Sequence, residues 1–176
     1  MRKTEDKHHQ DGSVSQLCQN LMRRTVTLIL LGTLAACGPR EPQESTHEIH
    51  GTKEERVAVI SKLISTAAPL PGAILDAHFI EEQTGDGRLG PSDFRAFYAL
   101  TVAPDDLALW RSALPPMKSS MPSPGYATPK QPRDWWTTQK DFDGLEFFSP
   151  KSLTGRSNGW IGIAPDGRIF IYAYTM

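Results

Sequence analysis

The stretch that decides the fold of this chain is WIGIAPDGRIFIYAY, residues 160–174. Two apolar runs, 160–164 and 168–174, flank Pro165-Asp166-Gly167, which is typical of the turn of a β-hairpin. In the second run, the isoleucines face one side of the strand while Phe170 and two tyrosines face the other. Because both sides are apolar, we expect this strand to lie inside a sheet that is covered on both faces.

Upstream residues predict the rest of the sheet and two helices. Alternating apolar positions indicate strands at 74–83, with Leu75, Ala77 and Phe79 on one side, and at 94–102, and a short strand at 145–148. Thr52 and Glu55 have the spacing of a capping box, and apolar residues then recur at helical spacing until Pro69. Pro104 begins a second, shorter amphipathic helix that ends before Pro115. This order predicts an α+β fold, with an antiparallel sheet of about four to five strands packed by two helices and a C-terminal β-hairpin.

A candidate binding surface follows a connection rich in proline, residues 115–132, which we expect to be irregular. Adjacent residues in an extended chain point in opposite directions, so one ring of a tryptophan pair can enter the core while the other meets a partner. The alternative is that the pair only covers one end of the sheet. The residues of this candidate surface are Trp135, Trp136, Arg156, Asn158 and Trp160.

A leader precedes the domain. Arg23-Arg24 is followed by an apolar run of 11 residues, Val26–Ala36, and this run ends in the small residues Ala35 and Ala36. Such a pattern is typical of a secretory signal. The run is too short for a membrane-spanning helix, which needs about 20 residues.

Cys37 directly follows these small residues, and the stretch Leu34-Ala35-Ala36-Cys37 resembles the lipobox of bacterial lipoproteins. The resemblance implies cleavage after Ala36 and acylation of Cys37, which anchors the chain in a membrane; the alternative is ordinary secretory cleavage without lipid. Two or more acyl chains hold a protein firmly on a bilayer. Met22 fits the start of such a signal better than Met1 does.

The resemblance also implies a location and a domain organisation. Gly38 stands where many lipoproteins kept in the inner membrane have Asp, so we expect an outer-membrane lipoprotein that faces the periplasm. Residues 1–36 would be leader and signal peptide, and residues 37–51 the acylated cysteine and a flexible polar tether that includes His47 and His50. Residues 52–176 would form a single α+β domain, similar to the small periplasmic domains of Gram-negative lipoproteins; this similarity implies no activity.

Composition excludes several classes of function. Cleavage after Ala36 removes five of the 19 basic and three of the 20 acidic side chains, which leaves a formal charge near −3 and argues against a nucleic-acid partner. Cys18 is lost with the leader and Cys37 is acylated, so neither a disulfide nor a cysteine-type zinc site is expected. We expect no cofactor and no metal.

Two weak patterns could carry chemistry. Asp76 and His78 lie on the same side of one predicted strand, so the Asp76 carboxylate could orient the His78 imidazole for base catalysis. No serine nucleophile is identifiable, however. The segment from Glu82 through Asp86 and Gly87 to Asp93 has the spacing of a calcium-binding loop, but its predicted flanks are strands, so a hairpin loop is the better interpretation.

These observations favour a non-enzymatic, lipid-anchored binding or accessory module whose partner is an envelope protein or polymer. An inhibitor, an immunity protein and an envelope-assembly factor all fit this description. The alternative is a cell-envelope hydrolase that uses carboxylates such as Asp76, Asp86 or Asp93.

Overall fold

The computed structural model describes residues 44–65, 68–85, 92–117 and 124–175, which belong to a unit that begins at Pro42. In chain order the elements are β1 (Glu44–Glu48), α2 (Lys53–Ile64), β2 (Ile74–Thr84), β3 (Asp93–Val102), the 3₁₀ turn η1 (Pro104–Asp106), α3 (Leu107–Ala113), α4 (Gln139–Phe142), β4 (Glu146–Phe148), α5 (Lys151–Thr154), β5 (Asn158–Ile163) and β6 (Arg168–Tyr174).

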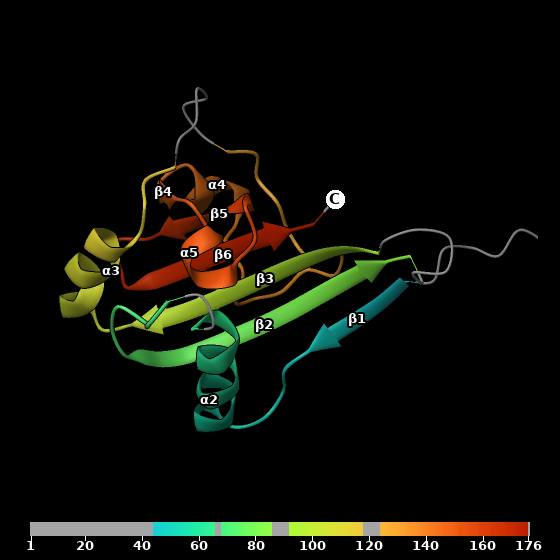
Figure 1. Cartoon of the computed structure of the whole chain (residues 1–176), viewed down its shortest axis with the longest axis horizontal. Helices are drawn as coiled ribbons and strands as arrows, with labels where there is room; N and C mark the ends of the chain where they lie inside the picture. Colours follow the sequence, from blue (N-terminus) through green and yellow to red (C-terminus); the bar gives the residue numbers. More distant parts are fainter. Residues whose placement is uncertain (1–43, 66–67, 86–91, 118–123, 176) are drawn as a thin grey trace, which may run out of the picture. The chain divides into compact units, whose positions relative to one another are not determined.

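The six strands form one antiparallel sheet in the order β1-β2-β3-β6-β5-β4 (Figure 1). The predicted α+β class and the C-terminal hairpin are confirmed, and the described residues contain six strands where four to five were expected. In the hairpin, Ile163 pairs with Ile169, and the Ala164 N–H donates to the Arg168 carbonyl at 2.9 Å across the turn. The strand β6 lies between β3 and β5, as its two apolar sides predicted.

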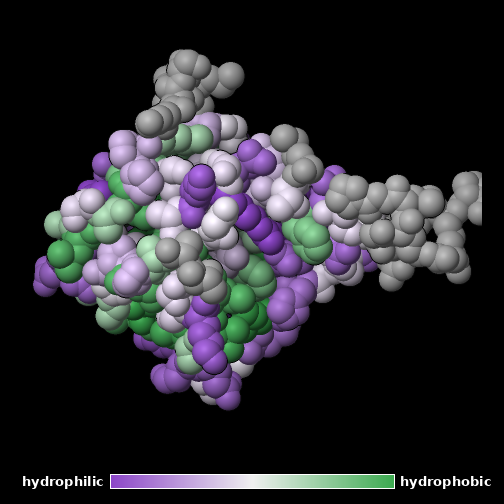
Figure 2. All heavy atoms as spheres, in the orientation of Figure 1, coloured by the Kyte–Doolittle hydropathy of each residue, from purple (hydrophilic) through white to green (hydrophobic). Residues whose placement is uncertain are grey.

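The first face of the sheet packs against α2, α3 and α5. Thr52 and Glu55 make the predicted capping box at the start of α2, and Ile60 and Ile64 of this helix are fully buried. Other side chains of this core come from α3, from α5 and from five strands: Leu107, Trp110, Leu153, Ala77, Phe79, Ala96, Tyr98, Leu100, Phe148, Ile161, Ile163, Ile169 and Ile171. Apolar side chains that stay exposed gather on and beside α2 and α3 (Figure 2), among them Val59, Leu63 and Leu109.

One strand position was predicted wrongly. Leu75 is 43% exposed, whereas Ile74 packs against the first core. The pairing of β2 with β3 shifts its register between Ile74 and Asp76. Side chains alternate between the two faces of a regular strand, and this irregularity interrupts the alternation. Ile74 therefore faces the core in place of Leu75.

The second face of the sheet is covered by the connection and the residues that follow it up to Leu145, rather than by long helices. Its described residues from 124 onward contain no strand, and α4 is a single turn. Side chains of this segment pack with strand residues in a second core: Tyr126, Ala127, Trp135, Trp136, Phe142 and Leu145 contact the group that contains Ile80, Phe97, Trp160 and Phe170. An irregular segment rich in proline therefore forms the third layer of the domain.

Part of the expected tether is a strand. Residues Glu44–Glu48, predicted to be flexible, form β1 and pair with Ile80–Thr84 of β2. Ion pairs hold β1 to the connection: Glu44 lies 2.6 Å from Lys130, and Glu48 accepts two hydrogen bonds from Arg133. The strand is thus stabilised by its backbone hydrogen bonds to β2 and by ion pairs with residues that are distant in sequence, and hardly by apolar burial.

Beyond β1, the edge of β2 is closed by α2 and its N-terminal loop. The Ile49 N–H donates to the Phe79 carbonyl at 3.3 Å, and Arg56 Nε donates to the Ala77 carbonyl at 2.8 Å. These bonds satisfy backbone carbonyls that an open edge would leave unpaired.

Candidate functional site

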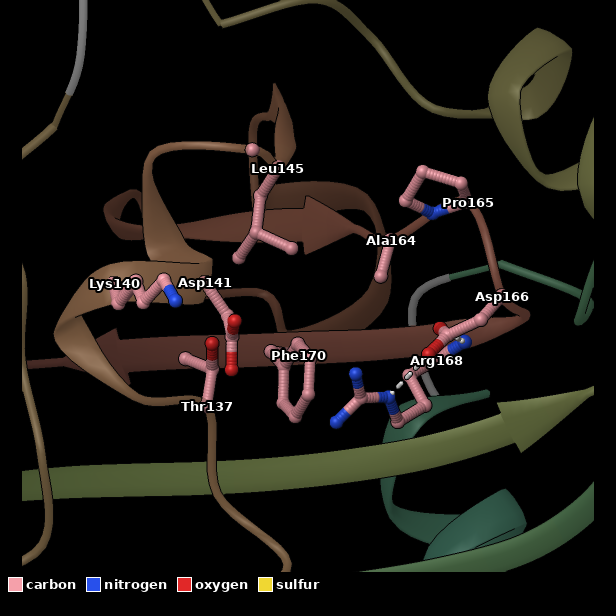
Figure 3. Close-up of a pocket in the computed structure, with 10 residues that line it drawn as sticks. Thr137, Lys140, Asp141, Leu145, Ala164, Pro165, Asp166, Arg168 and Phe170 are labelled. Atoms are coloured by element: carbon pink, nitrogen blue, oxygen red, sulfur yellow. Dashed lines mark hydrogen bonds and ion pairs between the residues drawn. The ribbon is translucent and has the colours of Figure 1, made fainter.

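A cavity of about 440 Å³ lies between the α4 segment and the turn of the C-terminal hairpin (Figure 3). We call it the Arg168 pocket. Its size is in the range of small-molecule sites. The lining residues are Thr137, Lys140, Asp141, Gly144, Leu145, Ala164, Pro165, Asp166, Arg168 and Phe170.

The floor of the Arg168 pocket is made of apolar core side chains. Phe170 is 1% exposed and belongs to the second core, as do Leu145 and Ala164. Phe170 is placed by β6, and Trp136 packs edge-to-face against it at 5.5 Å between ring centroids. The base of the pocket is therefore formed by core side chains, of which Phe170 is almost completely covered.

Arg168 and Asp166 form one charged side of the pocket. Arg168 Nε donates to Asp166 Oδ2 at 2.8 Å, and the Arg168 backbone N–H donates to Oδ1 at 3.2 Å. The guanidinium carbon lies 5.5 Å from the centroid of the Phe170 ring, within cation–π distance. The turn thus holds the guanidinium over the apolar floor, as Figure 3 shows.

Lys140 and Asp141 form the opposite side. Asp141 Oδ2 accepts a hydrogen bond from the Thr138 hydroxyl at 2.9 Å, and the Asp141 N–H donates to Thr138 Oγ1 at 3.2 Å, which caps α4. Within the part of the chain that the structure describes, the Lys140 side chain has no hydrogen bond or ion pair. The formal charges around the rim cancel, and the arrangement can bind a ligand with an apolar body and a charged head.

Two other cavities are less well suited. One of about 510 Å³ beside β1 is lined by charged groups that already pair with one another, such as Glu44 with Lys130 and Glu48 with Arg133. The other, of about 540 Å³, is lined by prolines and serines and reaches Met117, where the description of that segment stops.

Two residues of the predicted binding surface are buried. Trp136 is 5% exposed and Trp160 is 1% exposed, and both belong to the second core. Their indole N–H groups donate to carbonyls of the connection, Trp136 to Ala127 at 2.9 Å and Trp160 to Gly125 at 3.1 Å. These two tryptophans fasten the connection to the sheet, so including them in an exposed binding surface was wrong.

The other members of that surface lie apart from the pocket. Arg156 donates to Glu81 at 2.7 Å, beside Tyr98, and burial raises the pKa of Tyr98 to about 12. Asn158 begins β5 and pairs with Tyr174. Trp135 is half-buried and stacks on the ring of His78, with centroids 5.4 Å apart.

Asp76 and His78 do come together, but in a structural arrangement. Asp76 Oδ2 lies 3.9 Å from His78 Nε2, while Asp76 Oδ1 accepts hydrogen bonds from Arg56 at 2.6 Å and from the Ala77 N–H at 2.7 Å. Burial tends to raise the pKa of Asp76, but these two bonds and the charge of Arg56 outweigh it and hold the pKa below its usual 3.8. The carboxylate is thus committed to Arg56 and to the strand.

His78 titrates below its usual range. Partial burial lowers its pKa from 6.5, and the positive charge of Arg56 adds to this effect. The nearby carboxylates oppose it; they are Asp76, Asp134 and Glu48.

The carboxylates named for a hydrolase do not converge. Asp76 pairs with Thr101, whereas Asp93 pairs with Thr84 at the other end of the same two strands. Eight residues of strand separate the two ends, which is about 27 Å, while paired catalytic carboxylates lie within about 10 Å. Asp86 lies outside the described residues.

The loop with calcium-like spacing joins two strands, β2 and β3, as the hairpin interpretation expected. Its first acid, Glu82, is 4% exposed and accepts a hydrogen bond from the Lys130 N–H at 2.6 Å, so it is turned toward the connection. Among the described residues, no three His, Cys, Asp or Glu side chains come together as metal ligands. No helix of that part of the chain is long and apolar enough to cross a membrane.

The turn at Pro165-Asp166-Gly167 can be identified from the sequence, but the Arg168 pocket cannot. Its two sides come from segments about 25 residues apart, and no spacing rule connects them.

Ala36 and Cys37 lie outside the described residues. No protein-family model matches this chain, and neither a curated protein nor a solved structure is detectably similar to it.

Proposed function

We propose that the chain is a lipoprotein of the bacterial envelope, anchored through acyl groups on Cys37, whose domain is a non-enzymatic binding or accessory module in the periplasm. The observation that carries the proposal is the stretch Leu34-Ala35-Ala36-Cys37 after a basic pair and a short apolar run. It accounts for the location, because acyl chains of this kind keep a protein on the membrane.

The start of the domain supports this organisation. Residues 1–41 belong to a different unit from Pro42–Met176, so the proposed signal and cleavage site lie outside the unit that holds the sheet. Six residues separate Cys37 from Glu44, and fully extended they span at most about 25 Å. The tether that remains before β1 is therefore about half as long as composition suggested.

The site geometry supports binding over hydrolysis. Asp76 is held by Arg56, and Asp93 lies at the far end of the same strand pair. The Arg168 pocket, in contrast, combines a preformed apolar floor with charged groups at its rim, which suits recognition.

Cell fractionation tests the anchor, and the chain supplies its own control. We expect the wild-type protein in the membrane fraction, released only by detergent, and the Cys37→Ser variant in the soluble fraction. Cys18→Ser, which changes the other cysteine, should fractionate as the wild type does. If Cys37→Ser stays with the membrane, the proposed anchor is wrong.

Affinity capture after mild detergent tests the binding role. A partner captured by the anchored protein and lost with Cys37→Ser would support a module that works at the membrane. Turnover of an envelope polymer by the purified protein would instead favour the hydrolase alternative.

A further inference from the structure

We propose that the Arg168 pocket binds a compact hydrophobic carboxylate, such as the apolar C-terminal residue of a peptide or a small free acid. The carboxylate would lie on Arg168, near Lys140, and the apolar body against Leu145 and Pro165. This inference deepens the binding role proposed above and rests on it.

Two cationic groups at the rim keep N–H donors that no described residue uses, whereas each rim carboxylate already accepts at least one bond. Asp166 already accepts two bonds from Arg168, and Asp141 Oδ2 accepts one from Thr138. In contrast, the two Nη groups of Arg168 and the ammonium of Lys140 have no partner within the described residues. The free capacity of the pocket is therefore suited to an anionic head.

The geometry of Arg168 favours a carboxylate. Its Nε is occupied by Asp166, which leaves the edge formed by the two Nη groups for a ligand. This edge can donate two parallel hydrogen bonds to a carboxylate. The contact with Phe170 and the bond to Asp166 also restrict the guanidinium before a ligand arrives, which reduces the entropy lost on binding.

The remaining features limit the ligand to one charge and a small apolar body. Two cations and two anions line the rim, so no surplus positive charge is available for a polyanion. The side chains of Leu145, Ala164 and Pro165 have no hydrogen-bonding group, so this part of the pocket favours an apolar partner. A cavity of about 440 Å³ holds a group of the size of one or two amino-acid residues.

The Arg168 pocket lies far along the sheet from the first residue of β1. Glu44 pairs with Thr84 and Thr84 with Asp93, so β1 begins at one end of β3, whereas Arg168 pairs with Thr101 near the other end. The eight residues between these positions of β3 span about 27 Å. Arg168 is thus near the end of the sheet opposite to the one where β1 begins.

Titrations followed by ¹⁵N–¹H NMR test the proposal on the full chain carrying Cys37→Ser, which needs no membrane. The probes are N-acetyl-leucine, N-acetyl-leucinamide and inorganic phosphate. We expect N-acetyl-leucine to give saturable shifts in residues 137–145 and 164–170, and the amide and phosphate to bind at least tenfold more weakly. Equal binding of acid and amide would exclude recognition of the carboxylate, and equal binding of phosphate would exclude the role of the apolar floor.

Two arginines provide a matched comparison. Arg111 also donates through Nε to one exposed carboxylate, Glu146, at 2.7 Å, but it lies outside the pocket. Arg168→Gln should weaken binding of N-acetyl-leucine at least tenfold, Lys140→Gln should weaken it less, and Arg111→Gln should leave it unchanged. If Arg168→Gln keeps a folded spectrum and binds as the wild type does, the proposal is wrong. Binding by the Cys37→Ser protein would stand even if the anchor proposal failed, so the two can be judged separately.

Discussion

Trp136 fastens the connection to the second face of the sheet, and its removal should destabilise the domain strongly. The ring is 5% exposed and packs edge-to-face on Phe97 at 5.3 Å and on Phe170 at 5.5 Å. Its indole N–H donates to the Ala127 carbonyl at 2.9 Å. Trp136→Ala would therefore remove a core side chain and leave a carbonyl of the connection without its partner.

The expected cost follows from these contacts. Replacing a buried tryptophan by alanine costs about 3–5 kcal/mol, a range that includes the cavity left behind. The lost hydrogen bond contributes about 1 kcal/mol, which places the total cost toward the upper end of this range. In a domain of this size, 1 kcal/mol shifts the Tm by roughly 3–4 °C, so we expect Tm to fall by about 10–20 °C. Thermal unfolding followed by circular dichroism measures this change.

The neighbouring tryptophan is the control. Trp135 is half-buried and stacks on the partly exposed ring of His78, so Trp135→Ala should cost only about 1–2 kcal/mol. Trp136→Phe should fall between the two, because it keeps an aromatic ring and loses the hydrogen bond. A Tm for Trp136→Ala within about 3 °C of the wild type, or above that of Trp135→Ala, would refute the placement of Trp136 in the core.

Two further substitutions test the charged groups. Glu82→Ala should lower the free energy of unfolding by about 1.5–3 kcal/mol, because it removes the charge-assisted hydrogen bond from the Lys130 N–H to a buried carboxylate; urea unfolding measures this loss. The second substitution is His78→Gln. Because burial lowers the pKa of His78 below 6.5, the unfolded chain binds more protons between the folded pKa and 6.5, and stability falls as the pH is lowered through this window. We expect the urea midpoint of His78→Gln to change less than that of the wild type between pH 7.5 and 5.

Glu82→Ala has a matched control, and each of the two predictions has a result that would contradict it. Glu146→Ala breaks an exposed ion pair with Arg111 and should cost less than about 1 kcal/mol; an equal cost for Glu82→Ala would show that the connection is not held by the buried carboxylate. For His78, parallel pH curves of variant and wild type would show that the imidazole makes no difference to the pH dependence of folding.

Local signals in the sequence predict much of the fold. The hairpin at 160–174 has a turn sequence and two apolar runs, and the structure pairs them as expected. The helix start at Thr52 needs only Glu55 three residues later. In both cases the residues that determine the structure lie within a few positions of one another.

The parts that sequence reasoning missed depend on distant residues. Glu44–Glu48 has no apolar alternation, and its strand is specified by the ladder with β2 and by Lys130 and Arg133, which lie more than 80 positions away. Leu75 fits the alternation but lies next to an irregularity that only the pairing with β3 reveals.

The same reason limits prediction of the site. Trp136 and Trp160 were recognised as important aromatic residues, but their burial depends on the carbonyls of Ala127 and Gly125, which no spacing rule places above the sheet. The Arg168 pocket likewise arises only when the α4 segment packs beside the hairpin turn.

The proposal depends most directly on the chemical state of Cys37. Intact-mass analysis of the protein purified from the membranes of its native host measures that state. We predict a chain that begins at Cys37 and carries the added mass of a diacylglyceryl group and an N-linked acyl chain. A chain with a free thiol at Cys37, or one that still contains residues 1–36, would contradict the lipid anchor.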